Sequence, residues 1–200
     1  MIYRLINQMA TNTETTLINR ILNGETAAFS EVVDAYKNLV FSLALQMLKN
    51  QEEAEEVAQD TFVKVYSSLE SFKGDSKFST WIYRIAYNTC LDRLKKYKRK
   101  YLEEELNAVT ENKIYTTKNA LHEMEQKERS AKVKACLQYL PPEDAALLTL
   151  FYFEEKNLNE LEEIFEQSVN TLKVRLHRAR KKFALILENH IEPEVLRNYG

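Results

Sequence analysis

The stretch that decides the fold covers residues 72–100 and reads FKGDSKFSTWIYRIAYNTCLDRLKKYKRK. It opens with a Gly/Asp/Ser turn at residues 73–76, which separates two helical patterns. Ser79 or Thr80 is expected to cap the helix that follows. Apolar residues lie almost all round this predicted helix: Trp81, Ile82, Ile85, Ala86 and Cys90.

One stripe of the same helix is nevertheless largely polar. Arg84, Asn88 and Lys95 recur at helical spacing, with Leu91 among them. The helix ends in a cationic run: Arg93, Lys95, Lys96, Lys98, Arg99 and Lys100. A mostly buried helix with one polar stripe and a basic end suits an element that grips a nucleic-acid backbone and reads bases.

Composition favours a helical fold. The 200 residues are 44% hydrophobic, which allows one or two small domains with real cores. Only three glycines and three prolines occur, which favours helices over an all-β fold. The formal charge of −2 hides strong segregation of acidic and basic segments. We therefore predict an all-α protein whose charged helices carry the function.

The same survey places the chain in the cytoplasm. Cys90 and Cys136 lie far apart in apolar patterns, so neither a disulfide framework nor a metal site is expected. No apolar run approaches the ~20 residues that a membrane span needs, so membrane insertion is not expected. The first residues lack the continuous apolar block of a secretion signal.

Apolar spacing divides the chain into five parts. Residues 1–16 are a predicted N-terminal extension, 17–98 a first domain, 99–128 a flexible linker, 129–188 a second domain and 189–200 a tail. The first domain should hold a short helix at 17–22 and a long one that ends at Asn50. Its third helix, at 51–69, is predicted to bury Ala54, Phe62 and Val65.

The outer side of this third helix is strongly acidic. Its carboxylates are Glu52, Glu53, Glu55, Glu56 and Asp60. Two interpretations stand: a solvated acidic face with a favourable helix-dipole placement, or a docking surface for a basic partner.

The second domain has the pattern of a helix-turn-helix. A first helix through Val133 stops at residues 141–142, and a second begins at Pro142 or Glu143. Asn157 or Asn159 can cap a third, and a fourth follows residues 167–168 and runs to about residue 187. This is the order of a helix-turn-helix: a short turn, a supporting helix, another turn and a cationic helix.

The last helix separates into two faces. Its apolar stripe, which must face the core, comprises Val169, Leu172, Leu176, Ala179 and Phe183. Six basic residues and no acidic one occur between 173 and 182. This run is either a solvated basic face or a face that contacts bases and phosphates in a major groove.

Three segments resemble one family. The run FKGDSKFSTWIYRIAYNTCLDRLKK resembles region 2.3–2.4 of the extracytoplasmic-function (ECF) group of sigma-70 family transcription initiation factors. EEAEEVAQDTFVKVY resembles region 2.2 of that group, and SVNTLKVRLHRARKKF resembles region 4.2. The resemblance implies a region 2 helical bundle and a region 4 helix-turn-helix joined by a flexible linker. It also implies an RNA polymerase sigma factor that binds core RNA polymerase, recognises promoter −10 and −35 elements and promotes DNA opening.

The resemblance assigns residues to each task. Region 2 would grip the β′ clamp helices of the polymerase through Glu56, Gln59, Asp60 and Val63. It would flip a −10 base and hold the strand through Phe72, Lys73, Asp75, Ser76, Lys77, Arg84, Asn88, Arg93, Lys95 and Lys96. Region 4 would contact the β flap and read the −35 element through Asn170, Thr171, Lys173, Val174, Arg175, His177, Arg178 and Lys181. An anti-sigma factor is a further expected partner.

Several positions keep two interpretations. Trp81 fits either the core or a strand-separating role, and Tyr83 and Tyr87 either stack on DNA or pack on the first helices. The turn at residues 166–168 reads Glu-Gln-Ser where the family usually has Gly-Ile-Pro, and Val174 suits only an apolar contact such as a thymine methyl. The acidic linker either follows polymerase channels or is a plain spacer.

No catalytic chemistry is indicated. His122, His177 and His190 are scattered without a second ligand at metal spacing, and no phosphate loop or nucleophile elbow occurs. We expect no enzyme, no cofactor and no metal. Two rival functions are a helix-turn-helix regulator that binds duplex DNA alone and a helical adaptor that binds only protein.

Overall fold

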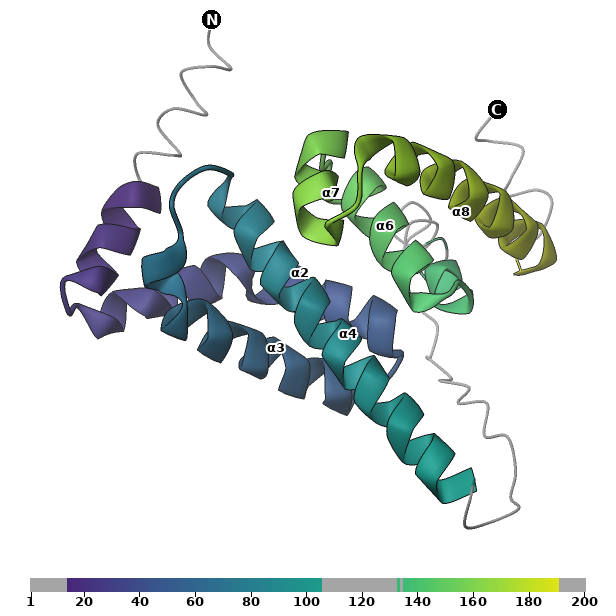
Figure 1. The fold of residues 1–200 in the computed structure, drawn as a ribbon, viewed down its shortest axis with the longest axis horizontal. Coiled ribbons are helices and arrows are strands. Elements are labelled where there is room, and N and C mark those ends of the chain that lie inside the picture. The colour runs from purple at the N-terminus through teal and green to yellow at the C-terminus, as the bar shows by residue number, and fades with distance from the viewer. Residues whose placement is uncertain (1–13, 106–132, 134, 191–200) are drawn as a thin grey trace, which may run out of the picture.

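The computed structural model describes residues 14–105, 133 and 135–190, and every regular element within them is a helix. In Figure 1 the purple-to-teal helices form one group and the green-to-yellow helices a second. The all-α, two-domain prediction is thus confirmed. Most of the predicted N-terminal extension and linker, and nearly all of the tail, lie outside the described residues.

The first group is built on three long helices. Residues 14–22 are helical, and η1 (Thr26–Ala28) leads into α2 (Phe29–Leu48). After α3 (Gln51–Ser67) and η2 (Leu69–Ser71) comes α4 (Phe78–Glu105). Asn50 does not end α2, as predicted, but caps α3, because its side chain accepts a hydrogen bond from the Glu53 N–H at 3.1 Å.

The start of α4 corrects a second prediction. Neither Ser79 nor Thr80 is the cap, because the helix already begins at Phe78 and the Lys77 carbonyl accepts the first bonds, from the N–H groups of Thr80 and Trp81. Phe78 is buried against the ring of Trp81, with centroids 5.7 Å apart. The helix therefore starts two or three residues earlier than a cap at Ser79 or Thr80 would place it.

The far end of α4 extends beyond the predicted domain boundary. The helix runs to Glu105, into the segment expected to be linker. Residues 99–105 are Arg, Lys, Tyr, Leu and three Glu, which are mostly strong helix formers, so local propensity favours continuation of the helix.

The second group matches the predicted helix order. Residues 133 and 135–136 are helical, followed by η3 (Leu137–Tyr139), α6 (Pro142–Tyr152), α7 (Leu158–Phe165) and α8 (Val169–His190). Pro142 occupies the first turn of α6, where its missing N–H costs nothing. Asn157 and Glu160 form a reciprocal capping box at the start of α7.

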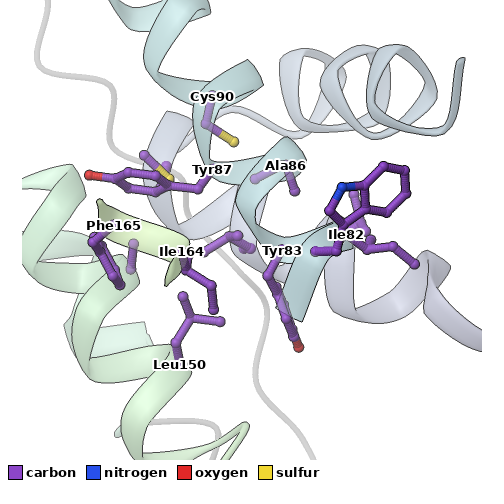
Figure 2. Packing of buried hydrophobic residues seen from close by; sticks show 14 of the residues in the cluster. Ile82, Tyr83, Ala86, Tyr87, Cys90, Leu150, Ile164 and Phe165 are labelled. Atoms are coloured by element: carbon purple, nitrogen blue, oxygen red, sulfur yellow. The ribbon is translucent and has the colours of Figure 1, made fainter. Parts of the chain in front are cut away.

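The two groups pack directly against each other. The ring of Tyr87 on α4 lies 4.6 Å, centroid to centroid, from the ring of Phe165 on α7. Figure 2 shows Tyr83 and Tyr87 on the side of α4 that meets Leu150, Ile164 and Phe165. One continuous apolar core therefore spans both domains.

Candidate nucleic-acid interface

Helix α4 presents different faces to different neighbours. Ile82 and Ala86 are buried among the helices of the first group, whereas Tyr83 and Tyr87 are buried on the side of α7 (Figure 2). The stripe that contains Asn88 remains exposed. The apolar residues that lie almost all round α4 are thus explained, because two domains cover the helix from two sides.

The tyrosines correct one prediction. Tyr83 and Tyr87 were expected to stack on DNA or to pack on the first helices, but both pack on the second domain. Burial raises the pKa of both phenols. The Nζ of Lys156 lies 5.2 Å from the centre of the Tyr83 ring, which adds a cation–π contact across the boundary.

Trp81 takes the core position of its two interpretations. Its side chain is only 6% exposed, and its ring lies 5.4 Å from that of Phe72 and 5.7 Å from that of Phe78. Phe72 and Phe78 flank the turn at residues 73–76 in the sequence, and their rings lie 5.1 Å apart, so this aromatic cluster brings the two ends of the turn together.

The turn and the two residues that flank it carry half of the predicted strand-capturing residues. Lys73 and Asp75 are exposed, Ser76 is half-buried, and Phe72 belongs to the aromatic cluster. Lys77, which ends the turn, forms an ion pair with Glu160 of the second domain, with Nζ and Oε1 3.0 Å apart.

The polar stripe of α4 is accessible. Asn88, Lys95 and Lys96 are exposed, and Arg84 is half-buried. Arg84 and Asn88 lie nearest the turn, whereas Lys95 and Lys96 lie about 26–27 Å along the helix from its start at Phe78. A charged backbone could lie along them without disturbing either packed face of the helix.

Arg93 lies elsewhere. Its guanidinium contacts Glu53, lies 2.9 Å from a Glu56 carboxylate oxygen and 3.3 Å from one of Asp60, all on α3. The Glu56 carboxylate is the main cause that raises the pKa of Arg93. The side chain is 18% exposed, so the structure separates Arg93 from the other cations of the helix.

The acidic side of α3 is open to solvent. Glu56, Gln59, Asp60 and Val63 are all exposed, and Val63 is an apolar side chain without a core role. Their common placement on the outer side of α3 gives a surface with both charge and apolar area.

The last helix also divides as predicted. Leu172, Leu176 and Ala179 are buried, whereas the opposite side is exposed. The exposed predicted residues on α8 are Asn170, Thr171, Lys173, Val174, His177, Arg178 and Lys181. Seven of the eight predicted −35 residues therefore share an accessible face.

Arg175 is the exception. Its guanidinium donates to the Gln167 side chain at 2.7 Å and lies 3.2 Å from Glu143 and 3.9 Å from Asp144. It also covers the Phe165 ring at 5.6 Å from the centroid. Arg175 thus ties α8 to α6 and α7.

Sequence reasoning missed the residues that join the domains. The Nζ of Lys156 donates to the Ser79 hydroxyl at 2.9 Å, and the Nζ of Lys49 donates to the Leu140 carbonyl at 3.0 Å. The Asn157–Glu160 spacing could have revealed a capping box. No sequence signal shows that Glu160 also faces Lys77.

Within the described residues, none of the helices is long and apolar enough to cross a membrane. No cluster of His, Cys, Asp and Glu there could hold a metal ion.

Both groups of helices are similar to known protein regions. Residues 32–100 match the model for sigma-70 region 2, and residues 130–183 match the model for sigma-70 region 4. The ECF RNA polymerase sigma factor SigW of Bacillus subtilis is 35% identical over 170 residues, which cover 82% of this chain and 91% of SigW. The RNA polymerase sigma-H factor of Pseudomonas aeruginosa is 31% identical over 172 residues, covering 82% and 89% of the two chains.

Solved structures show the same fold. The sigma factor RpoE, in complex with the anti-sigma factor NepR from Bartonella quintana, aligns with a TM-score of 0.65 at 18% identity over 80% of this chain and 96% of that one. CnrH, in complex with the cytosolic domain of CnrY, aligns with a TM-score of 0.57 at 21% identity over 87% and 96%. By its relatives, its two matched regions and its fold, the chain belongs to the ECF group of sigma-70 family RNA polymerase sigma factors, which act in transcription initiation.

Proposed function

We propose that residues 17–98 dock this sigma factor on core RNA polymerase and open the −10 element, while residues 129–188 hold the −35 element. Residues 99–128 would link the two. The observation that carries the proposal is that the polar stripe of α4 and the polar face of α8 are both exposed, on helices whose other faces are buried. Each surface can take DNA without unfolding its domain.

The polymerase contact is assigned to the acidic side of α3. Glu56, Gln59, Asp60 and Val63 would meet the β′ clamp helices, and their exposure supports this. Cationic partner groups would pair with the carboxylates, and Val63 would supply apolar contact.

The −10 contact is assigned to the turn and the α4 stripe. Phe72, Lys73, Asp75, Ser76 and Lys77 would surround a flipped base, and Arg84, Asn88, Lys95 and Lys96 would hold the strand. Unstacking a base costs a few kcal/mol, which a rigid pocket can recover. The aromatic contact between Phe72 and Phe78, at the two ends of the turn, would contribute to that rigidity.

The −35 contact is assigned to the first turns of α8. Lys173, Val174 and His177 would face base edges, and the flanking cations would meet phosphates. Val174 is half exposed and offers only a methyl surface, which favours a thymine.

A second polymerase contact is assigned to an apolar groove of the second domain. The groove, about 430 Å³, is lined by Leu137, Leu148, Tyr152, Phe183 and Leu187, among others. It would receive the β flap. An anti-sigma factor, such as the one bound to RpoE of Bartonella quintana, would regulate the protein. We place the protein in the cytoplasm with the polymerase, which performs the chemistry while this chain has no enzymatic activity.

The test is in vitro transcription with purified core polymerase and a promoter library. Start sites should depend on this protein, and Asp60→Ala should reduce their use by impairing docking. Glu52→Ala is the matched control, because it removes an exposed carboxylate of the same helix outside the proposed docking set. Arg84→Lys should impair opening but not docking.

The rivals give different results. A helix-turn-helix regulator would bind duplex DNA alone and would create no polymerase-dependent start site. A protein-only adaptor would show no DNA affinity that falls steeply with salt. Either outcome would contradict the proposal.

A further inference from the structure

The contacts of Arg93 set it apart from every other cation of α4 that the structure describes. Its Nη1 contacts Glu53 and lies 2.9 Å from Glu56, and its Nη2 lies 3.3 Å from Asp60. The Arg93 side chain is 18% exposed, against 63% for Glu56 and 58% for Asp60. Arg93 therefore lies beneath the two carboxylates, whose outer sides remain in solvent.

This position is poor for binding DNA. A phosphate that approached Arg93 would meet three carboxylates first, and like charges at close range repel. Both terminal nitrogens of the guanidinium are already engaged. Lys95 and Lys96, in contrast, are exposed on the same helix.

The position is well suited to shaping the acidic side of α3. Glu53, Glu56 and Asp60 are spaced by three and four residues, so their charges repel one another along one helix face. A guanidinium with a planar fork can hold several carboxylates in fixed directions. Each carboxylate has about four lone-pair sites, so those of Glu56 and Asp60 that face outward stay available to a partner.

We infer that Arg93 is a positioning residue for polymerase docking: it fixes Glu56 and Asp60 in the orientation that the polymerase receives. The inference rests on the proposed docking role of those carboxylates. It replaces the −10 DNA contact that the family resemblance implied for Arg93.

The experiment separates docking from DNA binding. The Kd for core polymerase is measured by competition with a labelled wild-type protein, and promoter affinity is measured on holoenzyme assembled at saturating protein. Arg93→Ala should raise the polymerase Kd roughly tenfold, which equals about 1.4 kcal/mol of lost binding free energy, because two docking carboxylates lose their fixed orientation. The promoter affinity of the assembled holoenzyme should not change.

Two variants sharpen the result. Lys96→Ala, which removes one exposed cation of the same helix, should give the reverse pattern, with an unchanged polymerase Kd and weaker promoter binding. Arg93→Lys should restore part of the docking, because it keeps the charge but loses the fork.

A double-mutant cycle tests whether Arg93 acts through the carboxylates. Arg93→Ala should cost less in the Asp60→Ala background than in the wild type, because only the part that acts through Glu56 remains there. Fully additive losses would overturn the inference, as would a normal polymerase Kd with weakened promoter binding. A loss caused only by misfolding of the Arg93→Ala variant would also be additive, so it would count against the inference. If the wild type itself did not bind core polymerase, the proposed function would fail instead.

Discussion

Helices α4 and α8 have the same composition pattern but different surroundings. Both are rich in cations, and each directs one arginine inward against acidic residues, Arg93 in α4 and Arg175 in α8. Each of these side chains is 18% exposed. The acids around Arg93 lie along α3, where two of them belong to the proposed docking surface, whereas those around Arg175 lie in the first turn of α6.

The two helices also differ in how much they bury. α8 packs on one side, while α4 is covered by its own domain and by α7 of the other. The comparison shows that a basic helix can serve as a joint between two domains. Only the stripe that neither domain covers is open for binding.

The largest expected effect comes from weakening the contact that α4 makes with α7 of the second domain. Tyr87→Ala deletes a 3% exposed ring that lies 4.6 Å from the Phe165 ring, and should cost about 3 kcal/mol of stability. The single unfolding transition expected of the joined core should split into two, as calorimetry would show.

Tyr97→Ala is the control for this variant. Tyr97 lies on the same helix but is exposed at 38%, so the loss should be at most about 1 kcal/mol and the transition should stay single. Equal effects of the two variants would mean that α4 is not a joint.

A smaller effect is expected at Arg175. Arg175→Ala removes the bonds to Gln167 and Glu143 and should lower the free energy of unfolding by about 1–3 kcal/mol, measured by urea denaturation. Arg178→Ala, on the exposed side of α8, should change stability by less than about 0.5 kcal/mol but weaken −35 binding. If Arg175→Ala weakened DNA binding without destabilising the fold, the proposed contrast between the two arginines would be wrong.

The smallest effect concerns the ion pair between the domains. Glu160→Gln keeps the capping box, since Gln serves at that position, but removes the charge that faces Lys77. The contact between the domains should weaken by about 0.5 kcal/mol, and this loss should vanish at high salt because salt screens the ion pair. Energy transfer between one dye on each domain would measure the change in the fraction of molecules whose domains are in contact.

The same pair predicts a pH dependence. Burial opposes ionisation of Glu160, but the Asn157 N–H and Lys77 together lower its pKa below 4.5. The contribution of the ionised carboxylate is therefore complete above pH 4.5 and is lost as the pH falls through the lowered value. Glu160→Gln should show no such loss in the same titration.

The sequence was sufficient for whatever depends on helical period. The buried Leu172, Leu176 and Ala179, the exposed face of α8 and the cap at Asn157 all follow from spacing and local bonding. These features need only the neighbours that each residue has within three or four positions.

The sequence was insufficient wherever the partner of a side chain is distant in the chain. Apolar period marked Tyr83 and Tyr87 as able to pack, but could not show that the covering surface is α7. Charge pattern grouped Arg93 and Arg175 with the other cations, because it cannot tell an outward guanidinium from one held by acids 32–40 residues away. The residue-level binding assignments accordingly remain proposals.

Glu160 has a consequence for how the two modules part. The carboxylate that closes the first turn of α7 also reaches Lys77 at the foot of α4. A phosphate that bound Lys77 would break the ion pair but leave the hydrogen bond from the Asn157 N–H to Glu160 in place. The first turn of α7 would therefore keep its shape while the ion pair is open, and the same ion pair could form again once the phosphate left.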